Sequence, residues 1–162
     1  MRFMKSIKNV QSTLKTGRFD KILVAVDGSG NSNRAARAAI TLCDGIGAEL
    51  SVVQAIPRPQ SRGMNVRLGP LLQDYYASSV KEAQKSVQNI VELAKKRGLR
   101  VTGEVLKSSD STVETILNYA ENKGVDLIVV GTRGLGGFTK LIMGSVSTGI
   151  VNHASCSVLI VR

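Results

Sequence analysis

Several residue types on which function often depends are scarce in this sequence. Among its 162 residues there is no tryptophan, aromatic residues make up 4%, and there are two cysteines and one histidine. Cys43 and Cys156 lie within apolar patterns and form no disulfide framework, which predicts reduced, intracellular thiols. Together with His153 they match no familiar tetrahedral zinc spacing. The lack of aromatic platforms also argues against recognition of single-stranded nucleic acid.

Long apolar runs and familiar catalytic motifs are absent as well. No run approaches the roughly 18 apolar residues of a membrane-spanning helix, and the N-terminus has no continuous signal-peptide core, so we expect a soluble, cytoplasmic protein. No Gly-x4-Gly-Lys-Ser/Thr loop is present, which argues against a P-loop ATPase. His153 lies far in sequence from any serine-containing elbow, so we expect no catalytic residues.

The apolar residues that are present indicate one α/β domain. They make up 43% of the sequence, and short apolar runs alternate with segments of helical periodicity. Such alternation without tandem hairpins predicts right-handed crossovers and a single doubly wound parallel sheet with helices on both faces. The expected strands span residues 21–26, 49–56, 99–106, 125–130 and 158–161. The expected helices span 32–46, 71–96 and 111–122, with a short helix after Ser145.

Positive charge is in excess, and part of it lies at the N-terminus. The formal net charge is +10, from 22 Lys and Arg against 12 Asp and Glu. This favours an anionic partner, whether a nucleotide, nucleic acid or a lipid surface. Residues 1–18 carry five of the basic residues and no acid, with an apolar stripe at helical spacing. We interpret them as an N-terminal extension, either a mobile tail or one packed on its own oligomer, rather than as a membrane-bound amphipathic helix. Residues 19–162 form the domain.

The first expected strand ends in polar residues. Ligands of open parallel sheets bind at the carboxyl ends of the strands, and residues 21–26 deliver Asp27-Gly28-Ser29 to that edge. The Asp27 carboxylate could accept hydrogen bonds from a ribose or an adenine amino group. Equally, Asp27 or Ser29 could cap the helix that follows.

A glycine-rich stretch follows the fourth expected strand. Gly131, Gly134 and Gly144-Ser145 can direct main-chain N–H groups toward an anion at the start of a helix, and Arg133 can add a fixed charge. This predicts a phosphate cradle. The alternative is that the glycines make a turn and that Ser145 caps the next helix.

The spacing Gly131, two residues, Gly134, nine residues, Gly144-Ser145 resembles the nucleotide-binding signature of the universal stress protein family. The likeness extends from Lys21-Ile-Leu-Val-Ala-Val-Asp27 to Cys156-Ser-Val-Leu-Ile-Val161, over roughly residues 19–162. Residues 107–110 depart from the glycine and proline or alanine of many members. The resemblance implies a Rossmann-like sheet of strand order 3-2-1-4-5, with the ligand between the first and fourth strand ends.

The resemblance also implies a set of contacts with ATP. Adenosine would meet Asp27 and Ala55, and Lys140 could close on the phosphates, although a solvated lysine is the expected state. The phosphates and ribose would meet Gly131, Arg133 and Gly134, and the triphosphate Gly144, Ser145 and Ser147. Val26, Val130 and Val146 would line the pocket.

The function implied is that of an ATP-binding stress-response protein, a nucleotide-dependent switch with slow or no hydrolysis. A divalent ion, Mg²⁺ or Mn²⁺, would be held by the nucleotide's phosphates. The resemblance further implies a homodimer that pairs along residues 158–161. The alternative is an interaction protein without bound nucleotide, whose basic surface engages nucleic acid, membrane or protein partners.

Overall fold

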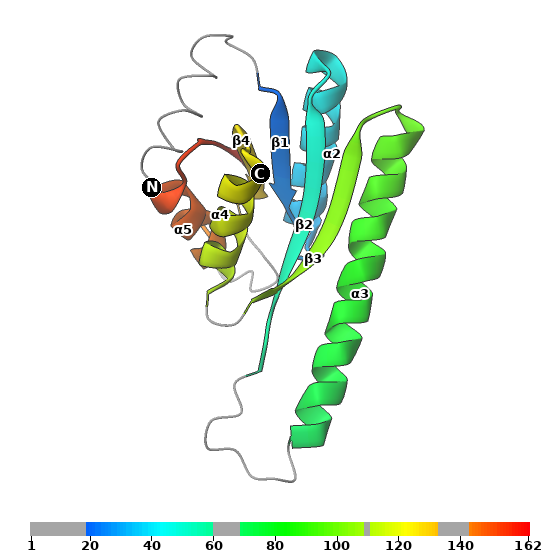
Figure 1. The fold of residues 1–162 in the computed structure, drawn as a ribbon, viewed down its shortest axis with the longest axis vertical. Helices are drawn as coiled ribbons and strands as arrows, with labels where there is room; N and C mark the ends of the chain where they lie inside the picture. The colour runs from blue at the N-terminus through cyan, green and yellow to red at the C-terminus, as the bar shows by residue number, and fades with distance from the viewer. Residues whose placement is uncertain (1–18, 60–68, 109–110, 133–142) are drawn as a thin grey trace.

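The computed structural model describes residues 19–59, 69–108, 111–132 and 143–162, which fold into one five-stranded parallel sheet with helices on both faces (Figure 1). The strand order is β3-β2-β1-β4-β5, as predicted. The strands are β1 (Lys21–Ala25), β2 (Glu49–Pro57), β3 (Val101–Ser108), β4 (Leu127–Gly131) and β5 (Ser157–Val161). The helices are α2 (Gly30–Ile46), α3 (Gly69–Lys96), α4 (Thr112–Lys123) and α5 (Ser145–His153).

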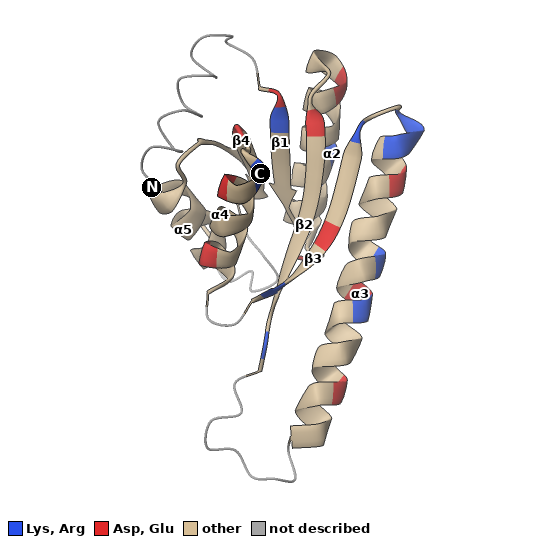
Figure 2. Cartoon of the chain, in the orientation of Figure 1, with Lys and Arg blue, Asp and Glu red and all other residues tan. Residues whose placement is uncertain are grey.

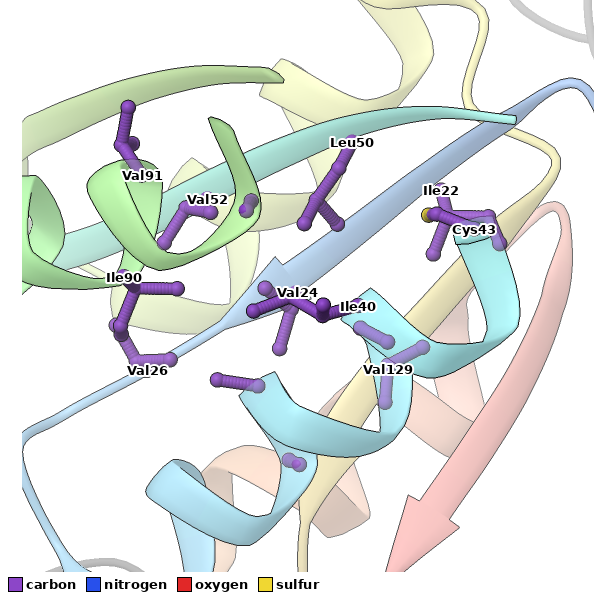
Figure 3. Packing of buried hydrophobic residues seen from close by; sticks show 14 of the residues in the cluster. Ile22, Val24, Val26, Ile40, Cys43, Leu50, Val52, Ile90, Val91 and Val129 are labelled. Carbon is purple, nitrogen blue, oxygen red and sulfur yellow. The ribbon is translucent and has the colours of Figure 1, made fainter. Parts of the chain in front are cut away.

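Two apolar cores lie on opposite faces of the sheet because successive strand residues point to opposite sides. On one face, Ile22 and Val24 of β1 pack with α2 and α3, as Figure 3 shows. On the other, Leu23 and Ile128 pack with α4 and α5. The central strands are therefore buried on both faces, which explains their continuous apolar runs.

Helix ends follow the polar residues and glycines of the sequence. The Ser29 side chain caps α2 by accepting a hydrogen bond from the N–H of Ser32, and the Ser111 side chain caps α4 by accepting one from Glu114. Gly47 and Gly124 end these two helices in the left-handed conformation. Helix α2 thus begins two residues earlier than predicted.

Charges of both signs are distributed over the described residues. These residues contain 13 of the 22 Lys and Arg and 11 of the 12 Asp and Glu, hence a net +2 of the total +10. Figure 2 shows basic and acidic residues interspersed, with Lys95 and Lys96 in the last turn of α3, where they complement the helix dipole. None of the helices in this part of the chain is long and apolar enough to cross a membrane.

Candidate functional site

The predicted site lies where two neighbouring central strands end. Strands β1 and β4 pair in parallel, and their register reaches Ala25↔Val130. Val26, Asp27 and Gly131 therefore meet at one edge of the sheet. Val26 and Val130 are buried and belong to the cores on opposite faces, so they form the floor of this edge rather than exposed walls.

Asp27 braces the turn that leads into α2. Its Oδ1 accepts a hydrogen bond from the N–H of Ser29 at 3.0 Å, and Gly28 between them has a φ of 82°. Ser29 then caps the helix through its own hydroxyl. The capping role considered for either residue thus belongs to Ser29. Asp27 remains partly exposed at the sheet edge, where a ribose contact stays a prediction.

Gly131 allows α2 to lie directly on the end of β4. A Cβ at this residue would stand 2.9 Å from the carbonyl carbon of Asn31 and 3.0 Å from its oxygen. The same turn of α2 is tied to β5, because Arg34 Nε donates to the carbonyl oxygen of Arg162 at 3.0 Å and Arg34 Nη2 donates to Asn31 Oδ1. Gly131 therefore has a packing role beside any role in phosphate binding.

The start of α5 is fastened to the end of β4. The N–H of Gly144 donates to the carbonyl oxygen of Thr132 at 2.8 Å, and the Ser147 hydroxyl lies 3.2 Å from that oxygen and 2.9 Å from the oxygen of Gly144. Ser147 is 4% exposed. The single hydroxyl proton of Ser147 is directed at these carbonyl oxygens. In this arrangement Ser147 therefore braces the start of α5 against the end of β4. The predicted contact of Ser147 with the triphosphate remains a prediction.

The first turn of α5 has the character of an anion site. Its N-cap residue, Gly144, makes no side-chain capping hydrogen bond, so no hydroxyl or carboxylate of the cap covers the amides of the first turn. Ser145 and Val146 follow and are both exposed, Val146 to 36%. These two residues are thus accessible to a ligand at the sheet edge. Ser145 is the first residue of the helix and not its cap, as one alternative had it.

Ala55 lies beyond the last paired residue of β1. The β1–β2 register ends at Ala25↔Val53, and the carbonyl oxygen of Val53 accepts a hydrogen bond from the N–H of Val26 at 2.9 Å. Peptide groups two residues apart in a strand point to the same side, so the N–H and C=O of Ala55 point toward the space above the end of β1. Ala55 is also partly exposed, whereas Val53 is fully buried.

Three predicted residues cannot be placed. Arg133, Gly134 and Lys140 lie outside the described residues, as do residues 1–18. The described part of the site therefore comprises the edge residues Val26, Asp27, Ala55, Val130 and Gly131, followed by Gly144, Ser145, Val146 and Ser147 at α5.

Three buried polar atoms could not be predicted from the sequence. Gln54 Oε1, Tyr76 Oη and Ser108 Oγ are buried without a hydrogen-bond partner among the described residues. Ser108 does not cap the helix that follows it, because Ser111 is the N-cap of α4. Burial of a serine at a strand end has no local sequence signal.

The described residues provide neither a metal site nor a histidine at the predicted site. No group of three His, Cys, Asp or Glu is placed there to hold a metal ion. His153 is exposed in the last turn of α5, at the opposite end of that helix from Gly144.

Comparisons with known proteins point to one protein family. The model of the universal stress protein family matches residues 18–162. Universal stress protein YxiE of Bacillus subtilis is 38% identical over 149 residues, covering 89% of this chain and 99% of the relative. The solved structure of universal stress protein UspA from Lactobacillus plantarum has a TM-score of 0.80 at 23% identity, covering 90% and 99% of the two chains.

Two solved neighbours contain adenine nucleotides. A universal stress protein in complex with cAMP has a TM-score of 0.65 at 24% identity, covering 89% of this chain and 97% of the neighbour. The universal stress protein from Archaeoglobus fulgidus in complex with dAMP has a TM-score of 0.65 at 20% identity, covering 89% and 98%.

Proposed function

The chain belongs to the universal stress protein family, and from this premise we propose that it binds ATP and acts as a nucleotide-dependent switch with slow or no hydrolysis. One observation carries the proposal. The ends of β1 and β4 bring Asp27 and Gly131 to one edge, and α5 begins there with an N-terminus that lacks a side-chain cap. A carboxylate for a ribose and helix amides for phosphates are the two kinds of group that a nucleotide needs.

The nucleotide has a natural orientation on these groups. The adenine would lie at the end of β2, where the main chain of Ala55 faces the space above β1. The ribose would lie at Asp27 and the phosphates at Gly144 and Ser145. The cAMP and dAMP found in structural neighbours support an adenine nucleotide as the ligand class.

The sequence segments that follow β2 and β4 are basic, which supports an anionic ligand. Residues 60–68, which follow β2, contain Arg62 and Arg67, and residues 133–142, which follow β4, contain Arg133 and Lys140. Neither segment contains an acid. This excess of positive charge in the sequence favours an anionic ligand.

Slow or absent hydrolysis follows from the groups available. Fast hydrolysis needs a base positioned on the attacking water, and Asp27, the carboxylate that follows β1, already accepts the N–H of Ser29. A divalent ion, Mg²⁺ or Mn²⁺, would neutralise phosphate charge and be held by the phosphates, because the described residues assemble no carboxylate cluster for it.

Titration calorimetry of the full chain with ATP and Mg²⁺ tests the proposal. We expect saturable binding of ATP, and loss of that binding in Gly144→Val, whose side chain would stand at the helix start against the phosphates. Gly45→Val is the matched control, because a Cβ at Gly45 meets no atom within 4 Å. No heat of binding at millimolar ATP would overturn the proposal, as would normal binding by a folded Gly144→Val.

The alternative of a basic protein surface that binds nucleic acid or membrane has less support. The described residues carry only +2 of the +10 net charge, and both signs are interspersed on them (Figure 2). Binding of random duplex DNA or anionic vesicles that falls steeply with salt, together with indifference to ATP, would favour the alternative.

A further inference from the structure

A buried hydroxyl lies at the end of β3 without a hydrogen-bond partner. Ser108 is 1% exposed, and its Oγ has no partner among the described residues. An unpaired buried hydroxyl destabilises a fold, so nearly all buried polar groups in proteins are paired with protein, water or ligand. The hydroxyl of Ser108 therefore needs an explanation.

The ordinary structural roles of such a serine are taken by other groups. Helix α4 is capped by Ser111, whose side chain accepts the N–H of Glu114 at 3.2 Å. The end of β3 is fixed through the main chain, because the carbonyl oxygen of Ser108 accepts the N–H of Arg58 at 2.7 Å. Neither the cap nor the strand end uses the Ser108 hydroxyl.

Ser108 lies on the same face of the sheet as Ala55. Leu106 is directly opposite Ala55 in the β2–β3 register, and both belong to the core under α4 and α5. Ser108, two residues after Leu106, points to that face too. On this face Ala25 and Ala55 stay partly exposed at the ends of their strands, so a ligand can approach the sheet here.

We propose that Ser108 is a specificity-determining residue of the nucleotide site, where its Oγ accepts a hydrogen bond from the exocyclic amino group of adenine. The inference rests on the proposed function. The base would lie across Ala55 with its amino edge toward β3. The amino group would then donate a hydrogen bond to the buried hydroxyl of Ser108. Binding would then supply the partner that the chain itself does not.

A two-by-two comparison on the full chain isolates this contact. Wild type and Ser108→Ala are titrated calorimetrically with ATP and with purine riboside triphosphate, which lacks the amino group. We expect Ser108→Ala to weaken ATP binding about five- to tenfold, the typical effect of one hydrogen bond. Wild type should bind the analogue more weakly by a similar factor, and the substitution should leave the affinity for the analogue unchanged.

Thermal unfolding without nucleotide provides the second readout. Removing an unpaired buried hydroxyl should leave the midpoint of nucleotide-free Ser108→Ala equal to or above that of wild type. The exposed Ser78→Ala on α3 is the matched control, which should leave nucleotide binding unchanged and should not lower the midpoint. A lower midpoint in Ser108→Ala would reveal a structural hydrogen bond and overturn the assignment.

The outcomes separate this inference from the proposed function. If wild type binds ATP and Ser108→Ala binds ATP and the analogue with unchanged or equally reduced affinity, the Ser108 contact is wrong and the proposed function stands. If wild type binds neither nucleotide, both are wrong.

Discussion

A side chain at Gly131 would collide with the backbone of α2. We expect Gly131→Ala to lower the free energy of unfolding by about 1–3 kcal/mol, because the new Cβ would stand 2.9 Å from the carbonyl carbon of Asn31, and a backbone yields less easily than a flexible side chain. Urea unfolding of the nucleotide-free protein measures this.

Gly30→Ala is the control for that substitution. A Cβ at Gly30 meets no atom within 4 Å, although it lies next to Asn31. We expect its unfolding midpoint to equal or exceed that of wild type. Equal stability of Gly131→Ala and wild type would contradict the close contact between Asn31 of α2 and Gly131 of β4.

The two thiols should make the free energy of unfolding fall as the pH rises through the alkaline range. Burial raises the pKa of Cys43 from 9.0 to about 11, and burial with the nearby charges of Asp126 and Glu121 raises the pKa of Cys156 to about 11. Between pH 9 and 11 the unfolded chain loses these protons while the folded chain keeps them. The free energy of unfolding should therefore be unaffected by the thiols below pH 9 and fall through this window, by on the order of 1 kcal/mol per thiol.

Other groups also titrate in that window, so the test is a comparison of slopes. Urea unfolding of the reduced protein at pH 8 and pH 10.5 is measured for wild type and for the double variant Cys43→Ala, Cys156→Ala. We expect a smaller loss of stability with pH in the double variant. Identical slopes would contradict the raised thiol pKa values.

The helices and strands are largely predictable from two features of the sequence. These are the periodicity of apolar residues and the glycine, proline and capping residues that separate the segments. Every predicted helix and strand is present, and the strand order that the family resemblance implied is confirmed. The ends are less predictable. Strand β3 begins at Val101 rather than Leu99, because the N–H of Leu99 bonds the carbonyl oxygen of Ala94 and closes the turn after α3. Leucine suits either role, so the pattern alone does not separate them.

The hydroxyl of Ser147 helps to hold the start of α5 against the end of β4. Because Ser147 braces the carbonyls of Thr132 and Gly144, we expect Ser147→Ala to cost about 1–2 kcal/mol of stability without nucleotide. Its affinity for ATP should fall as well, since the helix start is less fixed. Thermal unfolding and calorimetry measure the two effects.

Ser145→Ala is the control because Ser145 is exposed at the first position of α5. It should unfold as wild type does. A Ser147→Ala that loses ATP affinity without losing nucleotide-free stability would contradict the bracing role and favour direct contact of Ser147 with phosphate.

Several hydrogen bonds join residues that are far apart in the sequence, and local sequence patterns do not predict them. Asp126 Oδ2 accepts the N–H groups of Asp20 and Lys21, which lie more than 100 residues away, and Arg34 reaches Arg162 over 128 residues. Connectivity and the family resemblance predicted which strand ends meet. They therefore predicted that Asp27 lies beside Gly131. It could not predict which buried side chains would find partners, because that depends on packing among distant segments.

Strand β5 forms one edge of the sheet, and we expect a second copy to pair along its outer side. The segment Ser157–Val161 contains no charged residue or proline, the usual means by which edge strands avoid association, and Leu159 is 38% exposed. We expect wild type to be a dimer and Leu159→Lys to be a monomer by sedimentation velocity, because a lysine at this edge would lose its hydration in the interface.

Leu93→Lys on α3 is the matched control, since Leu93 is similarly exposed, at 41%, and lies outside β5. It should remain a dimer. Leu159 lies two residues before the end of its strand, opposite Val129 rather than Gly131, so monomeric Leu159→Lys should still bind ATP with wild-type affinity. A dimeric Leu159→Lys would place the interface elsewhere, whereas a monomer that no longer binds ATP would show that the nucleotide site depends on the dimer.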